Sequence, residues 1–526
     1  MGKYNQFYGL VQDNQKTFEE LIKKLRETEG EKKKENLACF LLWFATYHNT
    51  GYFTSSVLEK FFVDMAKSIS LKEKNISYEP NSFLHVLTEG SPRGGHTRVV
   101  ERWIKNAPLN QKHSVVFLKM CSADLPELKA YVEEKNGECI FLGNQTDLKN
   151  KALELRRLAL GYQYVICHTN MEDPTATVAF GTEEFTRPVA FYNHASHLFW
   201  IGKSMADVVL DIIQDDEITE IKRGIKNTFF VGVPLKEITY QVSDKNALRQ
   251  KLKLPTDKKI IVSSGSSFKF KPIGKNSMIP MLEKMIDEDT YCYLIGPSLK
   301  EKMWRDVYKK TNGHIIPLGY VNFNAGFLDY LSAADVYLDS YPLFGGTAMI
   351  DAIAQSTPGV SLKQTLLQFD YLTASKAFCE TQEEFIEKAV RVLNDKDYAK
   401  EVLNDLKANL EKYQSIKAWN NKMAELLKVM PEKHHVQDLS GEKDYHEIDD
   451  LAVLCNFLTE KNFIKEKPYK FEPTDVKSFV SAGVLLKKTG IKFIFEILKY
   501  RKYDSQTKVI KLFGIRIFKK TKKRRI

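Results

Sequence analysis

A glycine pair between a short apolar run and a helical pattern is the first feature that could bind a ligand. The run 336–340 is followed by Gly345 and Gly346, and after Thr347 apolar residues recur at helical spacing. This order predicts a strand, a glycine turn and a helix. Unpaired backbone N–H groups at a helix start favour a phosphate, and the Thr347 hydroxyl can cap the helix or donate one more hydrogen bond. Asp351, one turn later, is placed to accept hydrogen bonds from ribose hydroxyls. The alternative is a tight connection in a doubly wound sheet, with Asp351 an exposed helix residue.

Three histidines form a second candidate group. His96 lies in the glycine-bearing loop 90–98, and His194 and His197 lie in the segment 191–200. Both segments follow predicted strands. The unperturbed imidazole pKa of about 6.5 suits proton abstraction near neutral pH. We therefore expect a general base here, His194 first and His96 second, the alternative being structural histidines.

Alternating strand and helix patterns must position these residues. The first half predicts strands at 83–89, 114–120, 139–143, 164–169, 189–193 and 208–212; the second predicts them at 259–264, 291–296, 315–320, 336–340 and 358–362. Such alternation is typical of parallel sheets with right-handed crossovers, which bind ligands at the carboxyl ends of their strands. The predicted fold class is α/β, with two Rossmann-like domains facing each other across a cleft.

The remaining segments complete the predicted domain layout. We expect a helical extension over 1–80, Rossmann-like domains over 81–240 and 241–428, and a linker, helices and a basic tail over 429–526. The polar stretch after residue 430 suits an exposed linker, and 482–500 predicts a helix.

Length and composition exclude several classes of protein. The 526 residues are 43% hydrophobic, and no stretch reaches 18 uninterrupted apolar residues, so no transmembrane helix is expected. The first residues lack the apolar core of a secretory signal, which predicts a cytoplasmic protein. Seven cysteines are scattered singly, which is neither a zinc framework nor a disulfide framework.

The net charge of +11 is concentrated at the C-terminus. Residues 487–526 contain fifteen Lys or Arg against two acidic residues, so the rest of the chain carries −2. This excludes a nucleic-acid-binding body. In 509–518 basic and apolar residues nearly alternate, and such clusters bind anionic lipid headgroups. We expect residues 487–526 to bind an anionic membrane surface, the alternative being a solubilising tail.

Segments of both halves resemble glycosyltransferases of the GT-B fold. In the second half they are SSGSSFKFKP, IIPLGYV, AADVYLD and GGTAMIDAIAQSTPGVSL; in the first they are GGHTR and FYNHASHLFWIGKSMADVVLDI. The sequence is most similar to the group that contains O-linked N-acetylglucosamine transferase and the bacterial cytoplasmic N-glycosyltransferases. The similarity is densest over about 258–362. Two departures are the missing tetratricopeptide array, so that protein O-GlcNAc transfer is not implied, and Gly346 where the group often has His or Asn.

The resemblance implies a division of labour between the domains. Residues 81–240 would take the acceptor and residues 241–428 the nucleotide-sugar donor. The donor-binding residues implied are Lys269 beside the β-phosphate, with Lys271 as the substitute; Gly345, Gly346 and Thr347 as phosphate donors; Asp351 at the ribose; and Tyr320, through its backbone, at the base. Lysine acts at a phosphate as a compact point charge.

The implied activity is sugar transfer from a nucleotide-diphosphate sugar, expected to be a UDP-sugar. The acceptor would be a saccharide or a lipid-linked saccharide in bacterial capsule or lipopolysaccharide biosynthesis. No cofactor or metal is expected, because the acidic triplet 287–289 lies near a predicted helix end and reads as a solvated charge cluster. The alternatives are a protein glycosyltransferase, a nucleotide-sugar epimerase or polyol-phosphate transferase on the same fold, and a non-enzymatic membrane-binding module.

Overall fold

The computed structural model describes residues 4–449, apart from short gaps, and four strands between 485 and 523. The gaps within 4–449 are 72–75, 93, 120, 122–123, 144–146, 214–216, 236, 273–275, 324–325, 365–367 and 440.

The first domain is built on a seven-stranded parallel sheet with strand order β3-β2-β1-β4-β5-β6-β7. Its strands are β1 (Glu79–Leu87), β2 (Lys112–Phe117), β3 (Cys139–Phe141), β4 (Tyr162–His168), β5 (Val189–Asn193), β6 (Val208–Asp211) and β7 (Thr228–Phe230). The connecting helices are α4 (Gly95–Asn106), α5 (Pro126–Glu134), α6 (Leu148–Ala159), α7 (Thr175–Phe180) and a π-helical turn (Glu217–Lys222).

The second domain repeats this topology with a six-stranded sheet in the order β10-β9-β8-β11-β12-β13. Its strands are β8 (Lys259–Ser264), β9 (Thr290–Ile295), β10 (Ile315–Gly319), β11 (Val336–Leu338), β12 (Gly359–Leu362) and β13 (Phe378–Cys379). Its helices are α8 (Lys245–Leu252), a 3₁₀ turn (Ser267–Phe270), α9 (Ile279–Met285), α10 (Lys302–Lys310), α11 (Phe327–Ala333), α12 (Ala348–Ala354), α13 (Asp370–Thr373), α14 (Gln382–Asn394) and α15 (Lys396–Gln414).

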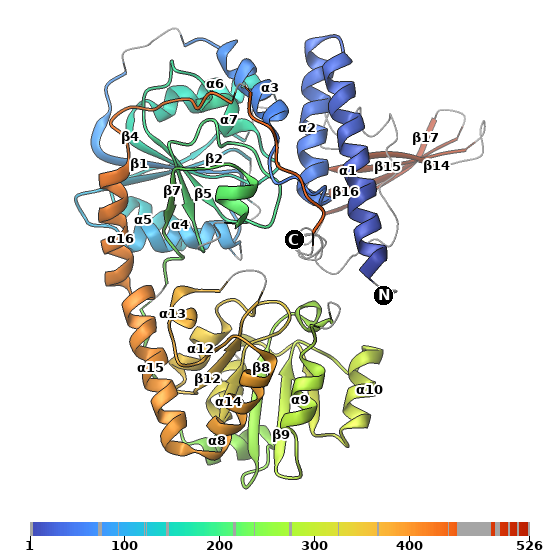
Figure 1. Ribbon diagram of the computed structural model, residues 1–526. Helices are drawn as coiled ribbons and strands as arrows, with labels where there is room; N and C mark the ends of the chain where they lie inside the picture. Colours follow the sequence, from blue (N-terminus) through green and yellow to red (C-terminus); the bar gives the residue numbers. More distant parts are fainter. Residues whose placement is uncertain are drawn as a thin grey trace.

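Both sheets have the Rossmann strand order, so the predicted α/β fold of two Rossmann-like domains is confirmed. In each sheet the order reverses beside the first strand, between β1 and β4 and between β8 and β11. Ligands of such sheets bind in the crevice outside the carboxyl ends of the strands at this switch point. Figure 1 shows the two domains one above the other, with α4 and α5 at the lower side of the first domain and α12 and α13 at the upper side of the second.

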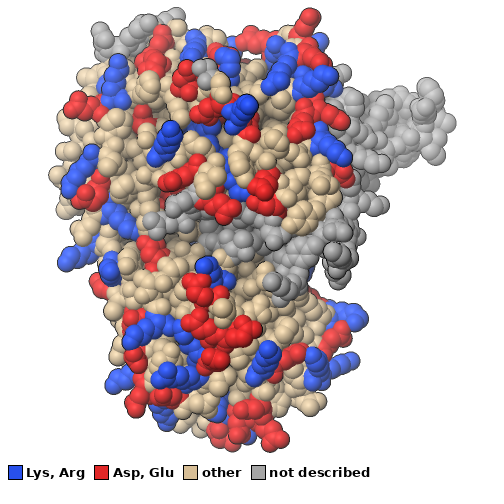
Figure 2. Space-filling model, viewed as in Figure 1, with Lys and Arg blue, Asp and Glu red and all other residues tan. Residues whose placement is uncertain are grey.

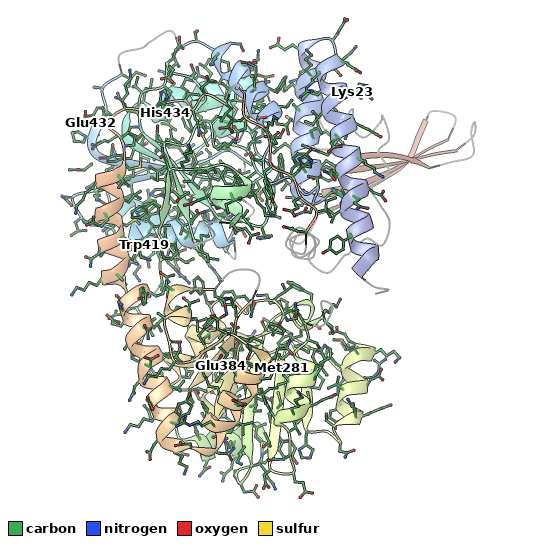
Figure 3. The ribbon with its side chains drawn as sticks, in the orientation of Figure 1. Lys23, Met281, Glu384, Trp419, Glu432 and His434 are labelled. Carbon is green, nitrogen blue, oxygen red and sulfur yellow. The ribbon has the colours of Figure 1, made fainter. Side chains whose placement is uncertain are left out.

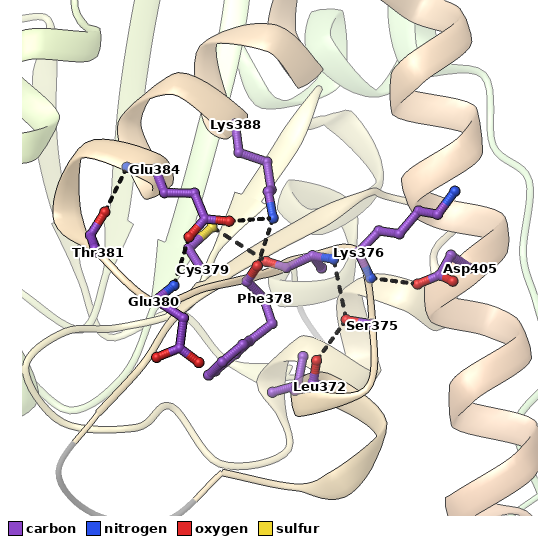
Figure 4. Close-up of polar contacts among 11 residues, drawn as sticks. Leu372, Ser375, Lys376, Phe378, Cys379, Glu380, Thr381, Glu384, Lys388 and Asp405 are labelled. Atoms are coloured by element: carbon purple, nitrogen blue, oxygen red, sulfur yellow. Dashed lines mark hydrogen bonds and ion pairs between the residues drawn. The ribbon is translucent and has the colours of Figure 1, made fainter.

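The edge strand β13 is short and is held by the helices that follow it. The Lys388 ammonium on α14 donates to the Phe378 carbonyl oxygen at 2.6 Å, and the Asp405 carboxylate on α15 accepts the Lys376 N–H at 2.7 Å. Thr381 caps α14 by accepting the Glu384 N–H (Figure 4). These contacts close the open edge of the sheet.

The N-terminal helices belong to the core of the first domain. They are α1 (Tyr4–Glu27), α2 (Glu31–Tyr47) and α3 (Ser56–Lys67). Buried side chains such as Phe18, Leu41 and Phe62 join one apolar cluster with Leu84 and Val165 of the central strands. The extension predicted over 1–80 is therefore helical, and it covers one face of the first sheet.

The last helix of the second domain crosses back to the first. α16 (Ile416–Val429) carries Trp419 (Figure 3). The Trp419 ring packs edge-on against Trp103 of α4, with ring centroids 5.5 Å apart. Leu426 and Met430 join the same buried cluster. This helix therefore fastens the two domains together.

The segment 431–449 is not the exposed linker that its polar composition predicted. His434 is 2% exposed, and both of its ring nitrogens are bonded, to an Asp207 carboxylate oxygen and to the Phe180 carbonyl, each at 2.8 Å (Figure 3). Further along, Asp449 pairs with Lys222 at 2.5 Å. Polar residues of this segment, such as His434 and Asp449, bond to the first domain. Composition alone therefore gave the wrong prediction.

The C-terminal helix expected over 482–500 is also wrong. The structure has a four-stranded antiparallel sheet, β14 (Leu485–Thr489), β15 (Phe495–Lys502), β16 (Ser505–Leu512) and β17 (Ile515–Lys523). Near-alternation of apolar and basic residues, noted above for 509–518, is the pattern of strands, and it extends to the neighbouring segments.

Charges on the visible face of both domains are mixed in sign (Figure 2). This agrees with the near-zero net charge of the chain before residue 487. None of the described helices is long and apolar enough to cross a membrane.

Candidate active site

The switch point of the second sheet brings together two loops that the sequence analysis singled out. The loop after β8 carries Lys269, and the loop after β11 carries the glycine turn. The Lys269 ammonium donates to the Phe344 carbonyl oxygen at 2.7 Å, and the Leu343 N–H donates to the Lys269 carbonyl at 3.2 Å. Lys269 and the glycine turn therefore form one unit, called here the donor corner (residues 265–270 and 339–347).

A buried carboxylate organises the donor corner. Asp339, 1% exposed, follows β11, and its Oδ1 accepts the N–H groups of Ser340 at 3.0 Å and Gly345 at 3.1 Å. Burial raises the pKa of Asp339 to about 6, although these hydrogen bonds and the Lys269 ammonium oppose the rise. A Cβ atom on Gly345 would lie 2.6 Å from Asp339 Oδ1, so only glycine fits.

The charge of Lys269 is available at the corner without a tight ion pair. The side chain is half-buried, and burial lowers its pKa while Asp339 works in the opposite direction. Its bond to a neutral carbonyl is weaker than a bond to an anion. A phosphate at the corner would therefore compete well for the ammonium.

The glycine turn opens toward solvent beyond Gly345. Gly346 has φ +81°, and a Cβ there would meet nothing within 4 Å. Thr347 is exposed and its side chain makes no capping hydrogen bond to α12, which leaves the second of its two expected roles, a donor to a ligand. Because α12 has only seven residues, the backbone N–H groups and Lys269 must supply most of the attraction for an anion.

Asp351 faces the other domain. It lies on α12 and is coupled electrostatically to Arg102 of α4, which opposes the burial that raises the pKa of Asp351 to about 6. The Arg102 guanidinium also donates to the Pro234 carbonyl at 3.2 Å, in the segment that joins the domains. The helices that begin at the two switch points are therefore electrostatically coupled here.

The two remaining donor candidates, Tyr320 and Lys271, lie outside the donor corner. Tyr320 follows β10 and is 86% exposed. The neighbouring Gly319 uses both backbone groups, donating to Pro297 O at 2.6 Å and accepting from Gly296 N at 2.8 Å, so Tyr320 is the position there that can meet a base. Lys271 is half-buried after the 3₁₀ turn, with its N–H bonded to Phe268 O at 3.1 Å.

The carboxyl edge of the first sheet holds two of the three predicted histidines together. The rings of His96 and His194 are stacked, 3.8 Å between centroids and 15° between planes. His96 Nδ1 lies 3.0 Å from the His168 carbonyl oxygen, which fixes the proton on Nδ1 and makes Nε2 the acceptor nitrogen. His194 Nε2 lies 2.9 Å from His168 Nδ1. His197 lies three residues further along the same loop and is half-buried there.

Several residues of the site were missed in the sequence. Asp339 could have been found, because a carboxylate directly after a buried strand at a switch point is unusual. Arg102 and His168 carry no such signal, since their partners come from other strands or from the other domain.

The acidic triplet 287–289 lies on the wrong edge for the donor. It precedes β9, at the amino end of the sheet, where the Asp287 carboxylate accepts from Thr290 Oγ1 at 2.6 Å and Asp289 pairs with Lys258 at 2.5 Å. Within the described part of the chain, no group of three or more His, Cys, Asp or Glu side chains is arranged to hold a metal ion.

Comparison with solved structures finds similar folds at low sequence identity. HepE from Anabaena, solved with UDP and glucose, is 15% identical with a TM-score of 0.46 over 66% of this chain and 100% of HepE. A glycosyltransferase from Rickettsia africae is 11% identical with a TM-score of 0.49 over 66% and 98% of the two chains. A mutant O-GlcNAc transfer enzyme from Thermobaculum terrenum is 11% identical with a TM-score of 0.47 over 80% and 83%. Two of these three are sugar transferases by name. No protein-family model matches the sequence, and neither does any curated protein.

Proposed function

We propose that the protein is a glycosyltransferase that moves a sugar from a nucleotide-diphosphate sugar, expected to be a UDP-sugar, to a saccharide or lipid-linked saccharide acceptor. The observation that carries the proposal is the donor corner. At the switch point of a Rossmann sheet, a lysine without a tight ion pair, a glycine turn and an exposed threonine lie together. This combination suits a diphosphate better than it suits a structural role.

The donor corner would stabilise the departing diphosphate. As the bond between the sugar and the β-phosphate breaks, negative charge grows on the phosphate oxygens. Lys269, the backbone N–H groups near Gly346 and the Thr347 hydroxyl are suited to meet that charge, and preorganised donors of this kind are usually the largest catalytic contribution. Asp351 would hold the ribose hydroxyls and Tyr320 would approach the base. No metal is required, so added chelator should leave the activity unchanged.

The histidine pair would activate the acceptor. His194, or His96 stacked on it, accepts the proton of the acceptor hydroxyl as the oxygen attacks the anomeric carbon. Burial lowers the pKa of His194 well below its usual value, so at physiological pH the ring is neutral and one of its nitrogens carries a free lone pair.

Thermal unfolding with a panel of nucleotides and nucleotide sugars tests the donor assignment. A ligand at 100 times its Kd adds about 2.7 kcal/mol to the stability of the folded state. We expect a rise in Tm with a uridine diphosphate and with one UDP-sugar, and sugar transfer when a matching acceptor is added. If no nucleotide or nucleotide sugar changes the Tm, the proposal is refuted. An epimerised sugar, or hydrolysis with no transfer product, would indicate the alternative enzymes on the same fold.

The C-terminal sheet supports a membrane role for the same enzyme. Cross-strand pairing aligns Lys487, Lys499, Lys508 and Lys520 in one row across β14 to β17. The row two residues along the strands consists of Thr489, Ile497, Ile510 and Phe518. A segment whose sequence groups basic and apolar residues in this way suits an anionic bilayer surface.

We therefore place the enzyme in the cytoplasm, peripheral on the inner face of the membrane, with a role in capsule or lipopolysaccharide synthesis. Sedimentation with vesicles of anionic lipid tests this. The full chain should sediment with anionic vesicles and remain in solution with neutral vesicles, and a chain ending at Asp449 should remain in solution with both. Equal binding by the truncated chain would exclude the sheet as the anchor.

A further inference from the structure

A row of hydrogen-bonded histidines crosses the first sheet from the candidate base. From His194, Nε2 lies 2.9 Å from His168 Nδ1; His168 Nε2 lies 3.2 Å from His85 Nδ1; and His85 Nε2 lies 3.0 Å from His113 Nδ1. The row ends at Gln111, whose Oε1 lies 3.2 Å from His113 Nε2. Every link joins the Nε2 of one ring to the Nδ1 of the next.

The sheet register explains why the rings meet. His113 on β2 is paired with Phe83 of β1, and His168 on β4 is paired with Leu87, so the two flank His85 diagonally. Because side chains two residues apart in a strand share a face, the three rings lie on one face of the sheet. The row thus runs from the amino end of β2 to the carboxyl edge where His194 lies.

The three inner rings are buried and uncharged. His85, His113 and His168 are 0% exposed, and burial lowers the pKa of all three, that of His85 to about 3. Trp103 packs edge-on against His85, and Phe83 stacks on His113 with centroids 4.7 Å apart. Each ring is therefore a neutral imidazole, with one donor nitrogen and one acceptor nitrogen.

A row of neutral imidazole rings has only two arrangements of its N–H protons: all on Nε2 or all on Nδ1. With Gln111 Oε1 as the acceptor, His113 carries its proton on Nε2, and so in turn do His85, His168 and His194. His194 then has its lone pair on Nδ1. If a donor replaced the Gln111 oxygen, every proton would move to Nδ1, and His194 would have no acceptor nitrogen outside the row.

The charges around the row keep an added proton at the His194 end. Lys135 is 2% exposed, interacts unfavourably with a protonated His113, and donates to the Ala107 carbonyl oxygen at 2.7 Å. At the other end the titratable neighbour is His96, which faces both His168 and His194. The ammonium of Lys135 therefore opposes any movement of positive charge toward Gln111.

We propose that His168, His85, His113 and Gln111 are positioning residues that fix the tautomer of His194, so that Nδ1 accepts the proton of the acceptor hydroxyl. This inference rests on the proposed function and adds a mechanism to it. In the step itself a lone pair of the acceptor hydroxyl oxygen forms the new bond to the anomeric carbon, and the hydroxyl proton binds His194 Nδ1. The bond between the anomeric carbon and the β-phosphate oxygen breaks, and its electron pair leaves with the nucleoside diphosphate. The proton on Nε2 stays in its hydrogen bond to His168, which stabilises the imidazolium. No proton travels along the row.

The test replaces the hydrogen-bond acceptor at Gln111 by a donor and leaves the residues of the active site unchanged. Gln111→Glu keeps an acceptor beside His113, whereas Gln111→Lys offers only donors. Asn110→Lys, at the exposed neighbouring position, is the control for added charge. Nitrogen-15 NMR of histidine-labelled protein reports which ring nitrogen of His194 carries the proton, and does so without any substrate.

We expect Q111E and N110K to keep the Nε2–H tautomer of His194. Q111K should shift it to Nδ1–H and lower kcat by about 10²-fold, within the range for loss of a general base, with the donor KM unchanged. An unchanged tautomer in Q111K would overturn the inference, as would a changed tautomer with unchanged kcat. The NMR signal needs no turnover, so the two proposals can fail separately. If the wild type has no transferase activity but Q111K still shows the tautomer shift, only the proposed function is refuted.

Discussion

Replacing Lys269 by methionine is the most direct test of the donor corner. Methionine keeps an unbranched apolar stem, so the substitution removes the ammonium with little change in volume. A charged hydrogen bond contributes about 1.5–3 kcal/mol, which corresponds to a loss of UDP affinity of roughly 10- to 150-fold. Donors that meet charge in the transition state cost a further factor of about 10²–10³ in kcat when removed. The bond from Lys269 to Phe344 O at 2.7 Å is also lost, and its contribution to stability is only about 1 kcal/mol.

Lys271→Met is the matched control, since it removes the same charge two residues away without touching the glycine turn. Calorimetric titration with UDP, steady-state kinetics and thermal unfolding should be run on both variants. We expect K269M to lose affinity and kcat while its Tm changes by a few degrees, and K271M to stay within about threefold of the wild type. Equal UDP affinity in K269M and the wild type, or a larger loss in K271M, would refute the placement of the diphosphate at this corner.

Four further substitutions test the site. Because the pKa of Asp351 is raised to about 6, its carboxyl is charged above that pH and neutral below it, and the donor KM of the wild type should rise as the pH falls through 6. Asp351→Asn should have a high KM and a weaker dependence, which then reports Asp339 alone, since the pKa of Asp339 is also raised to about 6. Gly345→Ala brings a Cβ to 2.6 Å from Asp339 Oδ1, and overpacking of this kind costs about 1–3 kcal/mol, so both Tm and donor affinity should fall. His194→Ala and His96→Ala identify the base, because its loss should lower turnover by about 10²–10⁴-fold. If neither variant lost more than about tenfold, the base would be a different residue.

The two sheets could be predicted because buried parallel strands are continuous apolar runs. The prediction for 259–264 coincides with β8 (Lys259–Ser264). The strands β7 and β13 were not predicted. β13 has only two residues, which is too short for any periodicity to show, and the three residues of β7 are all only partly buried. The C-terminal strands were mistaken for a helix, because their stability comes from cross-strand pairs that a local pattern does not contain.

The candidate site was predictable where one segment contains the whole feature. The glycine turn is such a segment, since its glycines, its threonine and its following helix are contiguous. The electrostatic coupling between Arg102 and Asp351 spans two domains, and His85, His113 and His168 are single residues on three strands. The three histidines are neighbours only because of the strand order, which cannot be derived from the sequence of any one strand.

The two passages of the chain between the domains lie beside each other. A side chain at Gly232, on the first passage, would lie 3.7 Å from both the Gln414 amide nitrogen and the Lys422 ammonium, which flank the second. Two adjacent connecting segments act as a hinge. Rotation of one domain against the other is therefore confined to an axis through this point. Closure about that axis would vary the separation between Lys269 and His194 while the geometry inside each half stays constant. Substrate assembly and product escape can thus be governed by one angle.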